Sequence, residues 1–339
     1  MNVGMYYNNS DVRLEQQPIP TVGDNDVLIK VAASGICGSD LMEWYRIKRA
    51  PLVLGHELTG EIVETGKNVR QWQKGDRVFA THHVPCDECR YCLSGHTTAC
   101  VVFQEKNNFT PGGFAEFLRV TGRSVATGIL KLPDIMSYET GNFIEPLATA
   151  VRAYRTINLT PGDSVVIYGS GLAGILFVKL AKALGAGTVI VSDINDYRLA
   201  MAKKAGADFI VSAIEDVPAF VTKHNGRLAD KAVICTGAMV AAEAALRSVD
   251  RGGTVLFFAV GKPGETIAID FNPYWRNDIS FKTCYGAAPL DNRQALELLR
   301  TGAVDVDDMI THRYHITEIG EAFKTAAEPT GTLKVIVTP

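Results

Sequence analysis

The second half of the chain alternates apolar segments with helix-forming segments, and this pattern restricts the fold more than any other feature of the sequence. The apolar segments SVVIYG, TVIVSD, DFIV, KAVICT and GTVLFFA lie within residues 164–259, separated by Ala-rich stretches such as LAGILFVKLAKALGA. Near-continuous apolar strands that alternate with helices are typical of a parallel sheet covered on both faces. We therefore expect a doubly wound α/β domain in this part of the chain.

The preceding part of the chain has a different pattern. DVLIKVAASG, LTGEIVETG, GDRVFAT and FAEFLRV are short strand-like segments broken by glycine, which predicts a β-rich, barrel-like domain. Residues 137–157 favour a helix before the α/β half. A length of 339 residues also favours two domains over one core. After about residue 289 the sequence predicts two helices and a last strand, LKVIVT, and the pattern alone does not assign this tail to either domain.

Composition and charge exclude several classes of protein. The formal net charge of -3 offers nothing that attracts nucleic acid. No apolar run reaches the roughly 18 residues of a membrane span, and the N-terminus lacks the basic and apolar regions of an export signal. We expect a cytoplasmic protein that acts on a small molecule, with neither nucleic acid nor a membrane as partner.

A glycine motif follows the first strand of the α/β half. In VVIYGSGLAG, Gly169, Gly171 and Gly174 form G-x-G-x-x-G between a strand and a helix. The first glycine permits a tight turn, the second lets the backbone approach a pyrophosphate, and the third lets the helix pack close to the strand. The N-terminus of the helix then offers N–H groups to the phosphates. The motif predicts a dinucleotide-binding site.

Asp193 ends the next predicted strand, nineteen residues after Gly174, where a ribose-binding acid is expected at about 20 residues. A carboxylate at this position accepts hydrogen bonds from the adenosine 2′-OH and repels a 2′-phosphate, so we expect NAD rather than NADP. The alternative is an aspartate that only caps the following helix, before Asn195.

Four of the seven cysteines, Cys86, Cys89, Cys92 and Cys100, lie within sixteen residues. Two-residue gaps bring the first three thiols round a tight turn, and the next loop can return the fourth to them. Four thiolates suit tetrahedral zinc. Two disulfides are the main alternative, but nothing marks the chain for an oxidising compartment. We expect a zinc ion there.

Three other segments carry candidate ligands of a second metal. Cys37 lies in GICGSD, His56 and Glu57 in GHELTG, and Glu145 in FIEPLAT. Each has a structural explanation when taken alone, as a small buried hydrophobe or a satisfied polar group. Together, a thiolate, an imidazole and one or two carboxylates suit an open catalytic zinc site.

These segments, with GGFAEF between them, occur in the order found in zinc-dependent medium-chain dehydrogenases, and the resemblance covers essentially the whole chain. The Glu of EPL resembles the sorbitol (L-iditol) dehydrogenase branch, because alcohol dehydrogenases carry a ligating Cys there. The resemblance implies a GroES-like, β-rich catalytic domain of residues 1–148 completed by 289–339, and a Rossmann NAD-binding domain of residues 149–288. It also implies a homodimer or homotetramer, and two zinc ions per chain, of which the ion at the four cysteines is structural.

The resemblance assigns roles to single residues. Cys37 and His56 match ligands of the catalytic zinc, and either Glu57 or Glu145 matches the third. Since a second carboxylate would leave the site with a formal charge of -1, we expect one glutamate to be bound in the empty site and displaced by substrate or water. Ser39 matches the hydroxyl that takes the alcohol's proton, and Thr149 a residue against the nicotinamide. The residues implied at the dinucleotide are Gly169, Gly171, Leu172, Ala173, Gly174, Asp193, Arg198, Thr236 and Val260.

The predicted function is zinc- and NAD-dependent oxidation of a secondary alcohol, a polyol, cyclitol or sugar phosphate, to a ketone by hydride transfer. One position departs from the family: Met42 stands where a His often ends the proton relay, and methionine carries no proton, which leaves the exit route of the proton open. The alternatives are an enzyme like L-threonine 3-dehydrogenase and a non-catalytic, NAD-binding regulatory member of the family.

Overall fold

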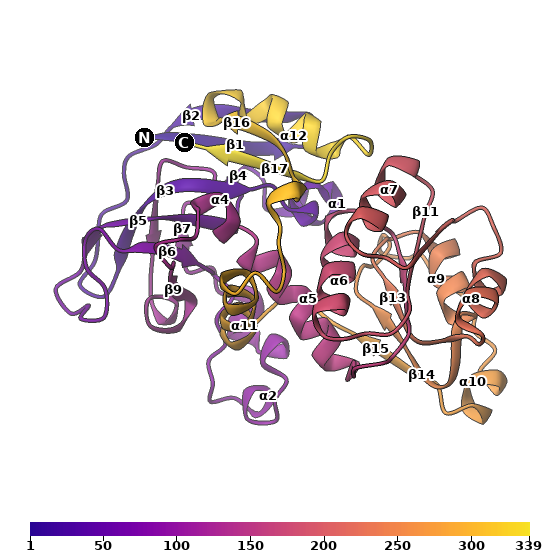
Figure 1. The fold of residues 1–339 in the computed structure, drawn as a ribbon. Helices are drawn as coiled ribbons and strands as arrows, with labels where there is room; N and C mark the ends of the chain where they lie inside the picture. The colour runs from indigo at the N-terminus through magenta and orange to yellow at the C-terminus, as the bar shows by residue number, and fades with distance from the viewer. The chain divides into compact units, whose positions relative to one another are not determined.

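The computed structural model describes all residues from 1 to 339, and the chain divides into two compact units (Figure 1). Unit 1 comprises Met1–Ala148 and Gly286–Pro339, and unit 2 comprises Thr149–Tyr285. The second join between the units therefore falls three residues before the expected position, residue 289. No helix combines the length and the apolar character that a bilayer crossing requires.

Unit 2 is built on a six-stranded sheet in which every neighbouring pair is parallel. The spatial order is β12-β11-β10-β13-β14-β15, which is the 3-2-1-4-5-6 order of a Rossmann sheet. The strands are β10 (Val165–Tyr168), β11 (Val189–Asp193), β12 (Phe209–Ser212), β13 (Ala229–Ile234), β14 (Val249–Phe257) and β15 (Ser280–Thr283). The doubly wound α/β prediction is confirmed.

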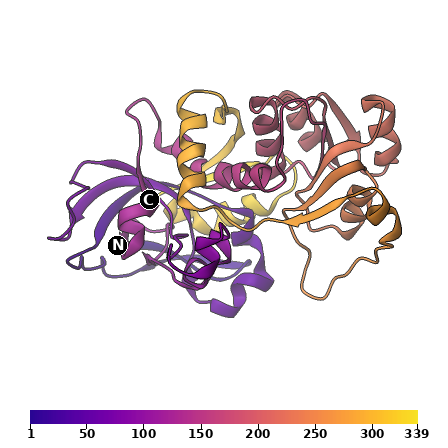
Figure 2. The ribbon, with the colours of Figure 1, turned by 90° about the horizontal axis from the view of Figure 1, so that it is seen from below.

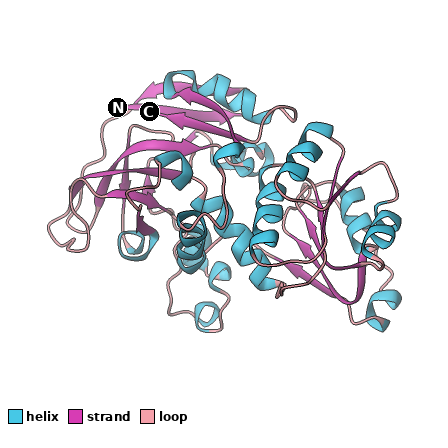
Figure 3. Cartoon of the chain, in the orientation of Figure 1, coloured by secondary structure: helices cyan, strands magenta, loops and turns pink.

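The helices of unit 2 cover both faces of this sheet, with α6 and α7 on one face and α8 and α9 on the other (Figures 1 and 3). They are α6 (Leu172–Ala183), α7 (Asp196–Lys204), α8 (Val217–Asn225), α9 (Met239–Leu246) and α10 (Asn272–Arg276). Buried side chains of β10, β11, β12, β13 and β14 form one core cluster with α8 and α9. The sixth strand, β15, does not follow from an apolar pattern, because three of its four residues are exposed at the edge of the sheet.

Unit 1 contains an eight-stranded sheet with the path β16-β17-β3-β5-β6-β9, to which β7 and β8 are attached beside β3, and a three-stranded sheet in the order β2-β1-β4. The strands are β1 (Asn2–Asn8), β2 (Asp11–Gln16), β3 (Val27–Gly35), β4 (Leu52–Val53), β5 (Glu57–Thr65), β6 (Arg77–Ala80), β7 (Phe109–Thr110), β8 (Phe117–Val120), β9 (Ile129–Lys131), β16 (Ile310–His315) and β17 (Lys334–Thr338). The β-rich prediction for this part is thereby confirmed.

The C-terminal tail belongs to unit 1. The last strand, β17, pairs antiparallel with β3 and parallel with β16, so segments some 300 residues apart share one sheet. The two ends of the chain lie side by side in unit 1 in both views (Figures 1 and 2). The tail is assigned to unit 1 by hydrogen bonds between strands that are distant in the sequence, and a local sequence pattern cannot show such bonds.

The helices of unit 1 are short except for the two in the tail. They are α1 (Glu43–Arg46), α2 (Arg90–Leu93), α3 (Val101–Glu105), α4 (Tyr138–Gly141), α11 (Pro289–Arg300) and α12 (Ile319–Ala327), and a 3-10 turn, η1, covers Gly38–Leu41. The single helix predicted over 137–157 is two helices, because the first, α4, ends at Gly141; the second, α5 (Ile144–Thr156), runs from unit 1 into unit 2. Ser137 caps α4 through a hydrogen bond from the Thr140 N–H.

Candidate active site

Cys37 lies where β3 passes into the η1 turn. Its Sγ accepts a hydrogen bond from the Ser39 N–H at 3.4 Å, and its own N–H donates to Asp40 Oδ2 at 3.1 Å. These reciprocal bonds form a capping box around the first residues of the turn. The thiol is consequently fixed at the end of a strand, with a fully buried carboxylate three residues away.

His56 immediately precedes β5, and Asp40 orients its ring. Asp40 Oδ1 lies 3.5 Å from His56 Nδ1. Burial lowers the pKa of His56, but the charges of Asp40 and Cys37 outweigh burial and raise the pKa well above its ordinary value. The residue before His56, Gly55, must be a glycine for two reasons. Its φ is +96°, and a Cβ there would lie 2.7 Å from the backbone nitrogen of Phe114. The anions around the imidazole therefore favour a positive charge at this point.

Glu57, the first residue of β5, completes a donor group. The ligand atoms of Cys37, His56 and Glu57 all lie within 4.8 Å of one another. Glu57 is fully buried; its Oε2 pairs with Lys334, while its Oε1 has no hydrogen-bond partner. An unpartnered buried carboxylate oxygen costs free energy unless something binds it. A sulfur, an imidazole nitrogen and this oxygen fit zinc.

Glu145, in the first turn of α5, lies outside that group of three. It is only 6% exposed, and burial raises its pKa to about 7. The charges of His56 and Lys334 act against this increase, and that of Glu57 adds to it. The structure therefore brings Glu57 close to the sulfur and the imidazole. Glu145 lies outside this group, but the charges of His56, Glu57 and Lys334 affect its pKa.

The sequence did not indicate several residues that contact the donor group or its neighbours Ser39 and Asp40. Arg46 donates to Ser39 Oγ at 2.8 Å and to the Ser39 carbonyl at 2.9 Å. His82 sets its ring edge-on to His56, with 5.8 Å between ring centroids, and burial holds its pKa well below the ordinary value. Asp40 lies in the η1 turn, Arg46 is the last residue of α1, and His82 follows β6. An Asp three residues after a turn cysteine was the one local signal, as the second half of a capping box.

The four cysteines also converge. Their sulfur atoms lie within 4.8 Å of one another, with Cys89 and Cys92 3.5 Å apart. All four are free thiols, and N–H groups of Cys86 and Cys89 donate to sulfur at 3.4 and 3.3 Å. These cysteines belong to a lobe of residues 85–105, and apart from the cysteines its buried core holds only Phe103. Four convergent sulfurs could hold zinc, and the lobe has little other means of staying folded.

The glycine motif has the form that a dinucleotide needs. Gly169 has φ +94°, and a Cβ at Gly174 would lie 2.0 Å from the Gly169 carbonyl oxygen. A Cβ at Gly171 would meet nothing closer than Arg198 at 4.0 Å, so its backbone faces open space. Gly171 caps α6 without a side-chain hydrogen bond, and Leu172 and Ala173 open the helix. The first N–H groups of α6 are thus accessible to an anion.

Asp193 lies at the end of β11, 7% exposed, beside the glycine turn. Its Oδ2 accepts hydrogen bonds from Ser170 N–H at 2.6 Å and Oγ at 3.0 Å, and its Oδ1 accepts one from the Asn195 N–H. Asn195, not Asp193, caps α7. The helix-capping alternative for Asp193 is therefore wrong, and its carboxylate joins two loops at one edge of the sheet.

The remaining predicted residues of unit 2 lie at the same ends of neighbouring strands. A Cβ at Gly169 would be 3.2 Å from the Thr236 Cβ, and one at Gly237 would be 2.9 Å from the Val260 carbonyl oxygen. Val260 is exposed. These loops follow β10, β11, β13 and β14, around the point where the strand order reverses, which is where ligands bind in open α/β sheets. Thr149 is the first residue of unit 2.

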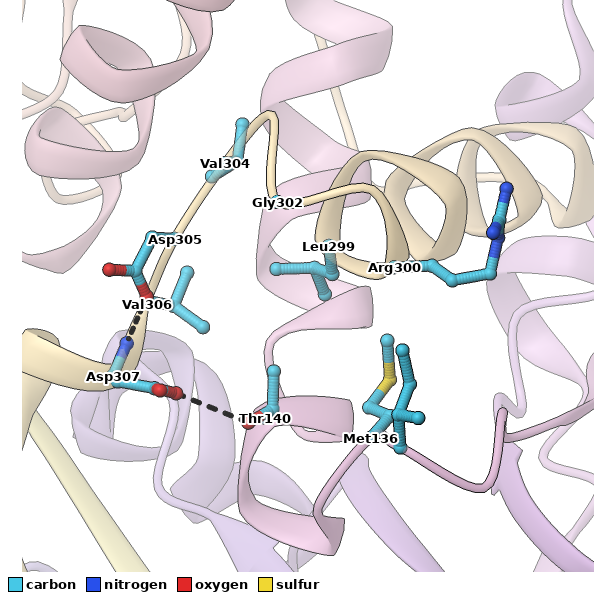
Figure 4. A pocket seen from close by; sticks show the side chains of 10 residues that line it. Met136, Thr140, Leu299, Arg300, Gly302, Val304, Asp305, Val306 and Asp307 are labelled. Carbon is cyan, nitrogen blue, oxygen red and sulfur yellow. Dashed lines mark hydrogen bonds between the residues drawn. The ribbon is translucent and has the colours of Figure 1, made fainter.

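A hollow of about 250 Å³ lies elsewhere in unit 1, between α4 and the end of α11 (Figure 4). Asp307 closes one side of it by accepting a hydrogen bond from Thr140 Oγ1 at 3.3 Å. Leu299 and Val306 contribute apolar walls, and no cysteine or histidine lines it. None of the predicted site residues lies there, so this hollow is separate from the candidate chemistry.

Comparison with known proteins decides the family. The family model "Alcohol dehydrogenase GroES-like domain" matches residues 23–134, and "Zinc-binding dehydrogenase" matches residues 173–301. The chain is 33% identical to sorbitol dehydrogenase of Bacillus subtilis (strain 168), with 100% of this chain and 97% of the relative covered. The chain belongs to the zinc-binding dehydrogenases.

Two further comparisons describe the range of these dehydrogenases that the chain resembles. L-threonine 3-dehydrogenase of Alteromonas mediterranea is 32% identical, with 92% of each chain covered. A solved zinc-binding dehydrogenase from Sinorhizobium meliloti 1021, described as bound to NADP, has a TM-score of 0.90 and 28% identity, covering 100% of this chain and 99% of that one. The protein is thus an oxidoreductase with a GroES-like part and a Rossmann part, and both donor groups could hold zinc.

Proposed function

We propose that this zinc-binding dehydrogenase oxidises a secondary alcohol of the polyol, cyclitol or sugar-phosphate class to a ketone, with NAD as the acceptor. The observation that carries the proposal is the donor group of Cys37, His56 and Glu57, whose ligand atoms lie within 4.8 Å, with one buried carboxylate oxygen left unpartnered. The similarity to a sorbitol dehydrogenase over the whole chain supports the substrate class.

We propose Cys37, His56 and Glu57 as the residues that hold the catalytic zinc, with Glu145 nearby but outside the set, and the four cysteines as the holders of a structural zinc. Bound among the three donors, zinc supplies Lewis acidity, which makes an alcohol's hydroxyl group a far stronger acid. Asp40 keeps the His56 ring in place through its Nδ1 and so leaves the other ring nitrogen for the metal. A thiolate and one carboxylate neutralise the ion's charge.

Ser39 is the residue we propose to receive the alcohol's proton. Its Oγ accepts a hydrogen bond from Arg46 at 2.8 Å, so its own hydrogen stays available to pass onward. The Arg46 guanidinium remains charged at any physiological pH and cannot end the relay, but it stabilises negative charge on Ser39 Oγ. With Met42 beside it, the half-exposed Ser39 hands its proton to water.

The residues of unit 2 are proposed to hold the dinucleotide, which accepts hydride at its nicotinamide ring. The Gly171 backbone and the first turn of α6 bind the pyrophosphate, and Thr149 is proposed beside the nicotinamide. Asp193 accepts hydrogen bonds from the adenosine ribose and favours NAD. Arg198 lies 4.0 Å from the Cβ position of Gly171, with a buried Nε that has no partner. Since the Sinorhizobium relative is described as bound to NADP, Arg198 makes NADP the alternative.

The test of this proposal is a panel of polyols, inositols, sugar phosphates and L-threonine, each assayed for the formation of reduced cofactor with NAD and with NADP. We expect a polyol, cyclitol or sugar phosphate to give the highest kcat/KM, with NAD preferred. L-threonine as the best substrate would favour the second candidate, which the 32% identity to a threonine dehydrogenase supports. Turnover of no alcohol in a protein loaded with two zinc ions would favour the regulatory alternative.

The proposal also covers the domain boundaries, the oligomeric state and the cellular location. We propose that residues 1–148 and 289–339 act as the catalytic domain and residues 149–288 as the NAD-binding domain, close to the joins of the two compact units. A homodimer or homotetramer is proposed from the family resemblance, to be tested by light scattering. A cytoplasmic location is proposed because a site of four thiolates requires reduced cysteines, which that compartment maintains.

A further inference from the structure

Lys334, the first residue of β17, has a fully buried side chain. Its ammonium group pairs with Glu57 Oε2 and lies 3.4 Å from the Ile36 carbonyl oxygen. The Nζ also lies 5.7 Å from the centroid of the Phe143 ring. Burying an ammonium group without a partner is strongly unfavourable, so this lysine depends on its partners.

The fold makes room for this ion pair. Gly35 ends β3 next to it, and a Cβ at Gly35 would lie 2.5 Å from Glu57 Oε2 and 2.7 Å from Lys334 Cε. Gly35 does not have a left-handed φ, so a glycine is required here because there is no room for a side chain. Three strands, β3, β5 and β17, thus supply the gap, the carboxylate and the ammonium.

The two oxygens of Glu57 have different surroundings. Oε2 is held by Lys334, whereas Oε1 is buried with no partner, on a carboxylate that lies within 4.8 Å of the ligand atoms of Cys37 and His56. An ion pair that served stability alone would satisfy both oxygens or could be replaced by apolar side chains at little cost. The unequal pairing of Glu57 points to a second cation for Oε1.

We propose that Lys334 is a positioning residue that shares Glu57 with the catalytic metal. By holding Oε2, Lys334 limits Glu57 to one oxygen at the metal and draws electron density away from the carboxylate. When substrate or water displaces Glu57, the departing carboxylate keeps a cationic partner and is not stranded as an unpaired buried charge. Lys334 therefore makes Glu57 a ligand that can leave. The inference rests on the proposed function, because it assigns a metal to the three donors.

The direct test is the rate at which the catalytic zinc passes to a chelator in the holoenzyme without substrate. Removing Lys334 frees Glu57 to bind the metal with both oxygens. Lys334→Met should therefore lose its catalytic zinc roughly tenfold more slowly than the wild type. Lys334→Arg keeps the charge and should lose zinc at close to the wild-type rate.

A cobalt-substituted protein provides a spectroscopic readout that a purely structural lysine would not affect. In Lys334→Met the visible absorption bands of Co²⁺ should change toward those of a higher coordination number, and in Lys334→Arg they should not. The matched control is Lys324→Met, since Lys324 is an exposed lysine that pairs with Glu321 on α12. The kcat of Lys334→Met should fall more than its KM changes, because Glu57 no longer leaves readily.

Lys334→Met strands a buried carboxylate and could fail to fold, so the double variant E57Q/K334M, in which both members are neutral, keeps the proposal testable. In the E57Q background, K334M should change the zinc release rate by less than twofold, because the effect acts through Glu57. Equal slowing in both backgrounds would show that Lys334 acts only as a distant charge and would overturn the sharing of Glu57. Faster or unchanged zinc loss in a folded K334M protein would also overturn it.

The outcomes separate the two proposals. If the wild type oxidises alcohols and K334M shows no change in zinc release or in the cobalt spectrum, the inference about Lys334 fails and the proposed function stands. If the wild type oxidises no alcohol but K334M holds its metal more tightly, the metal sharing stands and the proposed function fails.

Discussion

Among the single residues of the site, Asp40 connects two members of the donor group, Cys37 and His56. Its carboxylate accepts a hydrogen bond from the Cys37 N–H, lies 3.5 Å from His56 Nδ1 and 3.4 Å from an Arg46 nitrogen. Burial favours the neutral form of Asp40, but His56, Arg46 and the Cys37 N–H outweigh burial and lower its pKa. Asp40 is therefore charged and fixes both the imidazole and the turn that carries the thiol.

Asp40→Asn should weaken binding of the catalytic metal by about 10- to 100-fold, because an amide is a poorer acceptor for the imidazole N–H and no longer holds the ring orientation. The measurement is the zinc content of the protein after dialysis against a graded series of chelator concentrations. Glu43→Gln is the matched control, since Glu43 is an exposed acid three residues further along. Equal zinc retention in Asp40→Asn and wild type would contradict this role.

The cysteine lobe is the element that depends most on a metal. Its buried core consists of Cys86, Cys100 and Phe103, too few side chains to hold residues 85–105 in place by apolar burial. A series of neighbouring rings also connects the lobe with the catalytic donors. The ring of Phe103 stacks on that of His83, with 4.7 Å between centroids. The centroid distances are 3.9 Å from His83 to His82 and 5.8 Å from His82 to His56. Order in the lobe therefore bears on the position of His56.

Cys89→Ser should remove the structural zinc and unfold the lobe locally, because metal binding contributes on the order of 10 kcal/mol in comparable small sites. Hydrogen exchange should show faster exchange of the amides of residues 86–105, while the strands of unit 2 keep their protection. The neighbouring Ser94→Ala, which removes a hydroxyl bonded to the Arg90 carbonyl but leaves all four sulfurs in place, serves as the control. Unchanged exchange in the lobe of Cys89→Ser would contradict a structural metal.

Asp230 ties the start of β13 to the residue before β10. Its Oδ2 accepts hydrogen bonds from the N–H and Oγ of Ser164, both at 2.8 Å, and from Arg227 at 2.8 Å. Burial raises its pKa, but these donors outweigh burial and lower the pKa to about 2. Since this is below the roughly 3.9 of an unfolded Asp, the ionised group stabilises the fold above about pH 4, and this stabilisation is lost as the pH falls through about 2.

Asp230→Asn should lower the free energy of unfolding by about 1–2 kcal/mol near neutral pH, a value reduced for the partial exposure of the ion pair. The difference from wild type should shrink steadily below about pH 4. Urea unfolding followed at a series of pH values measures both quantities. Asp11→Asn, which removes an exposed partner of Arg13, should show no such trend. A difference that stays constant down to the lowest pH would contradict the assigned pKa.

At the scale of the whole molecule, the fold of unit 1 depends on both ends of the chain, because β17 near the C-terminus pairs with β3 near the N-terminus. The strands of unit 2 could be predicted, since each is a local apolar run followed by a helix, whereas β15 could not, because its exposed edge residues carry no apolar pattern. Cys37, His56 and Glu57 were predicted from their motifs. Lys334 was missed because its contact with Glu57 spans 277 residues of sequence, and no local pattern reports such a contact.

The measurement that tests the account most directly is the zinc content of wild type and Cys37→Ala, determined together with alcohol-dependent formation of NADH. We predict two zinc ions per chain and turnover in the wild type. For Cys37→Ala we predict one zinc ion, held by the four cysteines, an unchanged circular dichroism spectrum and turnover reduced by at least about a thousandfold, because the metal's Lewis acidity is lost. Two zinc ions or normal turnover in Cys37→Ala would contradict the assignment of the catalytic metal to Cys37, His56 and Glu57.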